Sequence, residues 1–482
     1  MSGVDDGAVI STRRFSKEST MKSMKIDTPQ GTMLLLPSHM VLLPAATPDG
    51  VVAEVEKEYS RGAAPDSAEN RHLPEDWEHV PFSPFKVERI GICTSTRCAL
   101  RCRYCLECSA ENQGTELDNK TILTYVNDGF EKWIVRNMLV GDAKPLQIYF
   151  TGGGEPVYDF QSFQELVSAI KDKSRQCSVP TELRITTNAV YGRGCMEFIC
   201  DHFSSIMISY DGLPEIQNKN RPSPHFPETS SVVESNIAYA LSRNVSVTIR
   251  TTILPQDVVR LKEMADFLYG KFGSNFAWSI FPVKEEGRAK GAGFDTRQEY
   301  SNVDFCDAYI EVCDYVKGRY GNVNVTSPIL APKKVDLYCG SLAAISDITW
   351  LRADARIATC LEMGAEETIV GHVVGSEVEY KTTVRDHLTR IALERRQLCR
   401  ECPAFPFCGG GCPAEHRTNT INGVKGLSWS CRQKIKFWQY VIGTAVSGRA
   451  CFGWRTQPSR CQRFGKYNVV ELREEDSHDH AR

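Results

Sequence analysis

Three cysteines near residue 100 have the spacing of iron-sulfur ligands. Cys98, Cys102 and Cys105 form a CxxxCxxC triplet, and Tyr104 precedes the third cysteine. Thiolates are the usual ligands of such clusters, and three on one short loop can hold three irons of a 4Fe-4S cluster. The fourth iron then stays open to a substrate or cofactor. A zinc site normally closes four ligands into a tetrahedron, and three inert buried cysteines are the other alternative.

A glycine-rich turn that ends in a carboxylate follows downstream. Residues 151–156 (TGGGEP) come directly after an apolar run at 146–150 that predicts a strand. Gly153 and Gly154 allow the backbone to approach a ligand closely, and Glu155 can accept a hydrogen bond from an ammonium group. Taken alone, this run could also be a plain turn between a strand and a helix.

The cysteine triplet and the Gly-Gly-Glu turn together resemble the radical S-adenosylmethionine (SAM) superfamily. In that superfamily the open iron binds the amino and carboxylate groups of SAM. One electron from the cluster then cleaves SAM to methionine and a 5'-deoxyadenosyl radical. The resemblance implies that Gly153, Gly154 and Glu155 lie at the SAM amino group.

Polar residues at the ends of later predicted strands extend this pattern. Parallel strands place ligands at their carboxyl ends, where Asn188, Ser209 and Asp211 stand. The resemblance implies that Ser209 contacts SAM. Arg221 and Arg250 could both pair with the SAM carboxylate, but a surface salt bridge is an equally good interpretation of Arg221.

A second group of cysteines lies in the C-terminal half. Its members are Cys339, Cys360, Cys399, Cys402, Cys408, Cys412 and Cys431. These spacings resemble the SPASM extension of radical SAM enzymes, which carries two auxiliary 4Fe-4S clusters and would bring the total to three. A zinc module is the alternative.

The resemblance also implies how the second group divides between two clusters. Cys399, Cys402, Cys408 and Cys431 would hold the second auxiliary cluster, whereas Cys339, Cys360 and Cys412 would hold the first. Members with four ligands at the first cluster have one more cysteine shortly after the position of Cys339, and this chain has none there. One iron of that cluster is therefore expected to be open. Ala355 replaces the family's usual glycine before Cys360.

Alternating strands and helices predict the elements that position these residues. Strands near residues 89, 148, 185, 207, 248 and 278, with helices between them, indicate an α/β fold with parallel strands, the partial (β/α)6 barrel of the superfamily. The expected domains are an N-terminal extension at 1–86, the barrel at 87–290, a helical connector at 291–335, the SPASM domain at 336–440 and a tail at 441–482. The extension contains a possible hairpin at 31–43, and it would either grip a leader peptide or cap the barrel.

Composition narrows the function classes. The chain has 482 residues, 41% of them apolar, and a net charge of -3, which argues against a nucleic-acid partner. No signal peptide and no apolar run long enough for a membrane span is apparent. The chain has 19 cysteines, and those expected to hold iron must remain thiolates, which requires a reducing compartment. We therefore expect a cytoplasmic protein.

The resemblance implies an oxidative reaction on a peptide or small protein, with electrons from a donor such as flavodoxin or ferredoxin. The open first auxiliary cluster favours formation of a thioether or carbon-carbon crosslink. A formylglycine-generating sulfatase maturase is the alternative enzyme, but Leu361 stands where that subgroup has a carboxylate, and Glu362 comes one position later. A non-catalytic iron-sulfur protein for electron transfer or binding is the alternative from another class.

Overall fold

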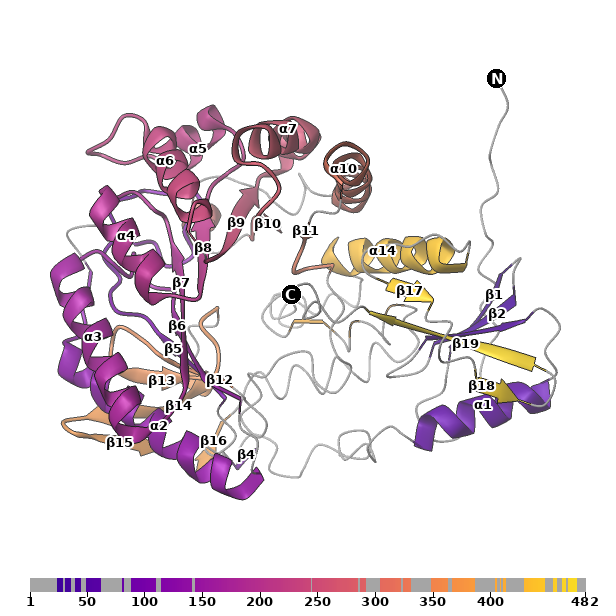
Figure 1. The fold of residues 1–482 in the computed structure, drawn as a ribbon, viewed down its shortest axis with the longest axis horizontal. Coiled ribbons are helices and arrows are strands. Elements are labelled where there is room, and N and C mark those ends of the chain that lie inside the picture. The colour runs from indigo at the N-terminus through magenta and orange to yellow at the C-terminus, as the bar shows by residue number, and fades with distance from the viewer. Residues whose placement is uncertain are drawn as a thin grey trace.

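A computed structural model gives the fold of the chain (Figure 1). It describes residues 24–28, 31–35, 40–44, 49–61, 80–81, 88–109, 114–140, 144–243, 245–284, 287–291, 304–321, 324–330, 348–362, 366–385, 404, 408, 411–412, 429–446, 454–456, 462–464 and 467–474.

The six expected barrel strands form one parallel series in chain order. They are β5 (Arg89–Ile92), β6 (Leu146–Phe150), β7 (Thr181–Thr187), β8 (Ser205–Ser209), β9 (Ser246–Ile253) and β10 (Ala277–Pro282). The helices between them are α2 (Asn119–Val140), α3 (Phe160–Cys177), α4 (Arg193–His202), α5 (Pro214–Asn220), α6 (Thr229–Leu241) and α7 (Leu261–Phe272). This arrangement confirms the predicted α/β barrel, which curves through the purple and magenta part of Figure 1.

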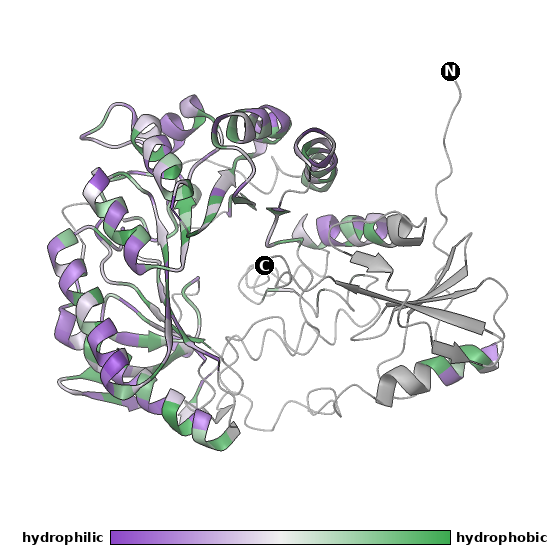
Figure 2. Ribbon diagram, in the orientation of Figure 1, coloured by the Kyte–Doolittle hydropathy of each residue, from purple (hydrophilic) through white to green (hydrophobic). Residues whose placement is uncertain are grey.

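Local sequence explains why these elements form. In α3 the buried side chains are Phe163, Leu166, Val167 and Ile170, which share one face of a 3.6-residue helix. The Asp159 side chain accepts a hydrogen bond from the backbone N–H of Ser162 at 3.1 Å and so caps the helix N-terminus. The helices that cover the barrel carry hydrophilic residues on their outer sides (Figure 2).

The barrel sheet continues beyond the six predicted strands at both edges. The connector helix α10 (Phe305–Tyr320) leads to β11 (Asn324–Thr326), which pairs in parallel with β10. At the other edge β12 (Ile348–Leu351) pairs in parallel with β5, followed by β13 (Arg356–Ala358), β14 (Ile369–Val374) and β15 (Glu377–Tyr380) in an antiparallel series. Segments expected to belong to the connector and the SPASM domain therefore share one 11-stranded sheet with the barrel.

A glycine makes the junction between β5 and β12 possible. Gly91 lies opposite Trp350 in the strand register, and a Cβ atom at Gly91 would lie 1.9 Å from the Trp350 ring. Any larger residue at this position would displace the indole. The sequence predicts β5 but shows no sign of this neighbour.

Strands from the two ends of the chain form a second sheet. The N-terminal strands β1 (Met24–Thr28), β2 (Gly31–Leu35) and β3 (Met40–Pro44) are antiparallel, and the expected hairpin is β2–β3. From the tail come β17 (Trp454–Thr456), β18 (Gln462–Phe464) and β19 (Tyr467–Glu474), and β19 pairs with β3. The predicted extension and tail are thus joined in one sheet.

Seven further elements complete the described chain. They are α1 (Asp49–Arg61), the paired strands β4 (Val80–Pro81) and β16 (Thr383–Val384), the 3-10 helices η2 (Pro255–Arg260) and η3 (Glu366–Thr368), α8 (Arg288–Gly291) and α14 (Trp429–Val446). α14 runs across the domain boundary expected at residue 440. Among the helices of the described residues, none has the length and apolar character needed to cross a bilayer.

Candidate active site

The three cysteines of the triplet lie on the loop that follows β5. Cys98 is buried, and Cys102 and Cys105 are partly buried. Burial, together with Glu155 and the neighbouring thiols, raises the pKa of Cys98 to about 12, and burial also raises the pKa of Cys102 to about 11. Thiolates at these positions therefore need a bound cation to stabilise them, which fits a metal cluster.

The backbone of this loop is held by groups from distant segments. Arg288 donates from its guanidinium to the carbonyls of Cys102 at 2.7 Å and Ser109 at 2.8 Å, and from its backbone N–H to the carbonyl of Cys105 at 2.9 Å. On the other side, the N–H of Arg103 donates to the carbonyl of Asn220 at 2.9 Å. Sequence analysis missed Arg288 because no local pattern marks it.

The glycine turn packs against the beginning of the cysteine loop. The N–H of Gly154 donates to the Ser95 carbonyl at 2.6 Å, and the N–H of Glu155 donates to the Arg97 carbonyl at 2.8 Å. A Cβ atom at Gly154 would lie 1.9 Å from the Arg97 oxygen, and Gly153 has a φ of +67°. Glycine is therefore required here for close backbone contact and for a left-handed conformation.

The Glu155 carboxylate joins this turn to the end of β7. One of its oxygens accepts a hydrogen bond from the Thr187 hydroxyl at 2.6 Å, and the other accepts one from the Asn188 N–H at 2.8 Å. Burial raises the pKa of Glu155 to about 7, although these two donors oppose the shift. Asn188 also directs its side-chain amide toward Cys98, with 3.5 Å between Nδ2 and Sγ. The turn, the end of β7 and the first cysteine are therefore in direct contact.

A buried ion pair lies beyond the end of β8. Arg221 forms an ion pair with Asp211 at 3.1 Å, and both side chains are buried. The surface salt bridge considered for Arg221 is therefore wrong. Tyr104 donates its hydroxyl to Asp211, and its ring lies 5.2 Å from the Arg221 guanidinium. Although burial opposes it, Asp211 raises the pKa of Arg221, so this group stays charged.

A second arginine, Arg250, lies near the first, within β9 and beside the end of β8. Arg250 pairs in register with Ser209 and stacks on Phe281 at 4.1 Å. Burial and the nearby Arg221 lower its pKa. The Nε atoms of both arginines are buried without a hydrogen-bond partner. Among the described residues, Asp211 is the one carboxylate in an ion pair with either arginine, so the site has capacity for another anion.

Comparison with known proteins shows which fold this chain has. No family model and no curated protein matches the chain. Among solved structures, anSMEcpe, an anaerobic sulfatase-maturing enzyme, with bound AdoMet (SAM) matches with a TM-score of 0.55 and 17% identity, covering 74% of this chain and 97% of that chain. The chain has the radical SAM fold. The same enzyme with AdoMet and Cp18Cys peptide gives a TM-score of 0.53, 16% identity and coverage of 74% and 96%. Streptococcus suis SuiB with the precursor peptide SuiA matches with a TM-score of 0.45 and 14% identity, covering 85% of this chain and 97% of that chain.

In this radical SAM fold, the predicted residues of the N-terminal half lie at one edge of the parallel sheet. Asn188 follows β7, Ser209 ends β8 and Arg250 lies within β9. The cysteine triplet follows β5, and the Gly-Gly-Glu turn follows β6. Sequence spacing alone could not show this proximity, which depends on strand order.

The C-terminal cysteines are described in part. Cys360 follows β13, Cys431 lies in the first turn of α14, and the N–H of Cys408 donates to the Ala404 carbonyl at 2.8 Å. Cys412 is also described, whereas Cys339, Cys399 and Cys402 lie outside the described residues. Within the described part of the chain, no three His, Cys, Asp or Glu side chains converge as single-ion ligands.

Proposed function

We propose that this chain is a radical SAM enzyme that oxidatively modifies a peptide or small protein by forming a thioether or carbon-carbon crosslink. One observation carries the enzymatic part of this proposal. The cysteine loop contacts two polar groups at the carboxyl edge of the sheet, since Asn188 reaches Cys98 and Tyr104 reaches the Asp211–Arg221 pair. A cysteine loop that only holds a structural iron-sulfur cluster or zinc ion would not require these contacts with polar groups at the sheet edge.

The residues of this edge fit the two cofactors of the family. Cys98, Cys102 and Cys105 would hold a 4Fe-4S cluster, which would bind SAM and supply the electron for its cleavage. The carboxylate of SAM matches the unpartnered cationic atoms of Arg221 and Arg250. Gly153, Gly154 and Glu155 would lie at its amino group, with the carboxylate of Glu155 fixing the turn rather than leaving it free to move.

The chain's own side chains prepare this site. Asp211 fixes the orientation of Arg221 and, through Tyr104, the position of the cysteine loop. Asn188 and Ser209 are buried polar groups at the strand ends, where they can bind the cofactor while water is excluded. Such preorganised, dry surroundings strengthen electrostatic contacts and protect a reactive radical from solvent.

A peptide partner and auxiliary clusters complete the proposal. anSMEcpe, which shares this fold, has been solved with the Cp18Cys peptide. Cys339, Cys360 and Cys412 would hold a first auxiliary cluster with an open iron, and Cys399, Cys402, Cys408 and Cys431 would hold a second. These clusters would accept the electron left on the substrate. A protein such as flavodoxin or ferredoxin would donate the electron for SAM cleavage in a reducing cytoplasm.

Co-expression tests this function directly. The enzyme is produced anaerobically with each short open reading frame beside its gene, and the masses of the intact and fragmented peptides are recorded. A loss of two hydrogens at a defined residue pair, absent with Cys98→Ala, is the expected result. If SAM is cleaved but no peptide changes in mass, the proposal that the enzyme crosslinks these peptides is wrong.

A sulfatase maturase remains the second candidate because of Glu362. This carboxylate pairs with Lys284 and acts electrostatically on Arg250, so it lies close to the proposed SAM site. It is also one position away from the carboxylate expected in that subgroup. Incubation with a peptide containing a sulfatase-type Cys or Ser distinguishes the candidates, because a maturase would produce an aldehyde that reacts with hydrazide probes.

A further inference from the structure

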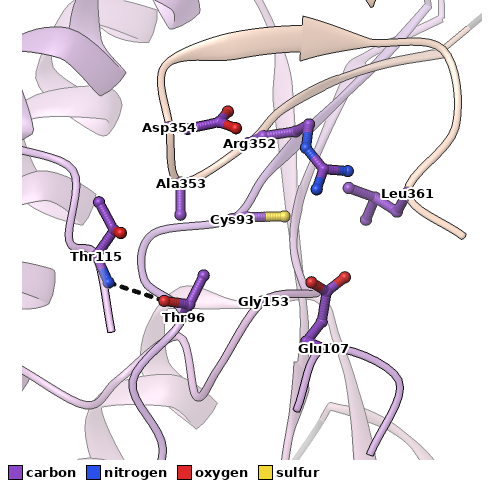
Figure 3. Close-up of a pocket in the computed structure, with 9 residues that line it drawn as sticks. All are labelled: Cys93, Thr96, Glu107, Thr115, Gly153, Arg352, Ala353, Asp354 and Leu361. Atoms are coloured by element: carbon purple, nitrogen blue, oxygen red, sulfur yellow. Dashed lines mark hydrogen bonds between the residues drawn. The ribbon is translucent and has the colours of Figure 1, made fainter. Parts of the chain in front are cut away.

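A small cavity lined by both charged and apolar residues lies between the cysteine loop and the β12–β13 turn. Its volume is about 130 Å³. The residues that carry its chemistry are Cys93, Thr96, Glu107, Gly153, Arg352 and Leu361. Figure 3 shows that the Glu107 carboxylate and the Arg352 guanidinium point toward one another across this space. One charge comes from the barrel side and the other from the hairpin that follows β12.

These two charges are not satisfied within the described chain. Among the described residues, neither the Glu107 carboxylate nor the Arg352 guanidinium forms a hydrogen bond or an ion pair, and the Nε atom of Arg352 is buried. The neighbouring Asp354 is engaged elsewhere, since it pairs with Arg356 at 2.7 Å. Partly buried charges that leave a space between them favour an occupant that bonds to both.

The surroundings of the cavity relate it to the proposed reaction. Gly153 belongs to the turn assigned to the SAM amino group, and Leu361 directly follows Cys360, a proposed ligand of the first auxiliary cluster. A group bound here would therefore lie between the two segments that the proposed function assigns to cofactors.

We propose that this cavity binds a neutral amide of the peptide substrate, an inference that rests on the proposed function. The amide N–H donates to Glu107 and the amide carbonyl accepts from Arg352. The charges of Glu107 and Arg352 sum to zero, and Asp354, which also lines the cavity, is balanced by Arg356. A neutral group with one donor and one acceptor therefore satisfies both Glu107 and Arg352 without introducing a net charge. An anion would face Glu107 unfavourably, and a cation would face Arg352.

Small probes test this chemistry on the reconstituted holoenzyme. Binding of N-acetylglycinamide, acetate and methylguanidinium is measured by ligand-observed NMR. The wild-type protein is expected to prefer N-acetylglycinamide. Glu107→Gln leaves a positive cavity and is expected to shift preference to acetate, whereas Arg352→Gln is expected to shift preference to methylguanidinium. Each variant should bind the amide about tenfold more weakly, which corresponds to the loss of one charge-assisted hydrogen bond.

A matched control separates the cavity from general effects of charge. Glu116 is a partly exposed carboxylate paired with Arg97 outside the cavity, so Glu116→Gln should leave all three preferences unchanged. Equal amide binding by all variants, or a holoenzyme crystal structure with Glu107 and Arg352 in direct contact, would overturn the proposal. SAM cleavage is measured in parallel, because its absence in the wild type would instead refute the proposed function.

Discussion

Replacing Arg288 by methionine is expected to loosen the cysteine loop. The guanidinium forms two hydrogen bonds to loop carbonyls, at 2.7 Å to Cys102 and 2.8 Å to Ser109. A hydrogen bond from a charged donor stabilises by roughly 1.5–3 kcal/mol. Methionine keeps much of the apolar stem, and the freed side chain regains roughly 2 kcal/mol of conformational entropy. Arg288→Met is therefore expected to lower the free energy of opening of the cysteine loop by about 2 kcal/mol.

Hydrogen exchange measures that loss locally. In the apoprotein, the backbone N–H groups of Arg101 and Arg103 donate to the carbonyls of Pro222 and Asn220, at 2.8 Å and 2.9 Å. A decrease of 2 kcal/mol in opening free energy corresponds to about 30-fold faster exchange of these two amides. Exchange in α3, which is distant in sequence and has its own core face, should not change.

A half-buried arginine away from the cysteine loop provides the control for this prediction. Arg260 pairs with Glu215 and Glu263, so Arg260→Met removes the same charge without touching the loop. In Arg260→Met, the exchange rates of the Arg101 and Arg103 amides should equal those of the wild type within experimental error. Unchanged exchange in Arg288→Met, or equal acceleration throughout the protein, would refute the reasoning.

Three further predictions concern stability, each measured by thermal unfolding. Ala355 has a φ of +62°, so Ala355→Gly should stabilise the protein by about 1 kcal/mol, and a lower Tm would contradict this. Asp211→Asn leaves the buried Arg221 cation without its ion-pair partner and should cost about 3–5 kcal/mol, whereas a Tm equal to wild type would refute the importance of the pair. Burial lowers the pKa of Lys132 from 10.5 to about 8, against the opposing effect of Asp128. The unfolded chain therefore binds more protons between these values, and the stability of wild type relative to Lys132→Met should rise from pH 8 to 10.5; a constant difference would contradict it.

Local sequence was sufficient for the barrel elements. β6 and β9 are runs whose alternate residues are buried, and the helical pattern of α3 places its apolar residues on one face. The cysteine triplet and the glycine turn are also local patterns. The strand-end positions of Asn188 and Ser209 followed from the same strand assignment.

Contacts between segments that are distant in the chain could not be predicted from local sequence. Nothing near Arg288 indicates that it binds carbonyls of the cysteine loop, and nothing in β3 indicates that β19 will pair with it. For Arg221 the sequence left a contact with SAM and a surface salt bridge equally open, because sequence does not reveal burial produced by packing. The position of the Glu107 and Arg352 side chains on opposite sides of one cavity likewise becomes apparent only when β12 joins the edge of the barrel sheet.

SAM cleavage tests the central claim most directly. The reconstituted protein is incubated anaerobically with SAM and a strong reductant, and 5'-deoxyadenosine is quantified by liquid chromatography. The account predicts 5'-deoxyadenosine from the wild type and none from a variant with Cys98, Cys102 and Cys105 all replaced by alanine, while iron at the C-terminal cysteines is retained. Equal formation of 5'-deoxyadenosine by both proteins, or none by an iron-loaded wild type, would contradict the account.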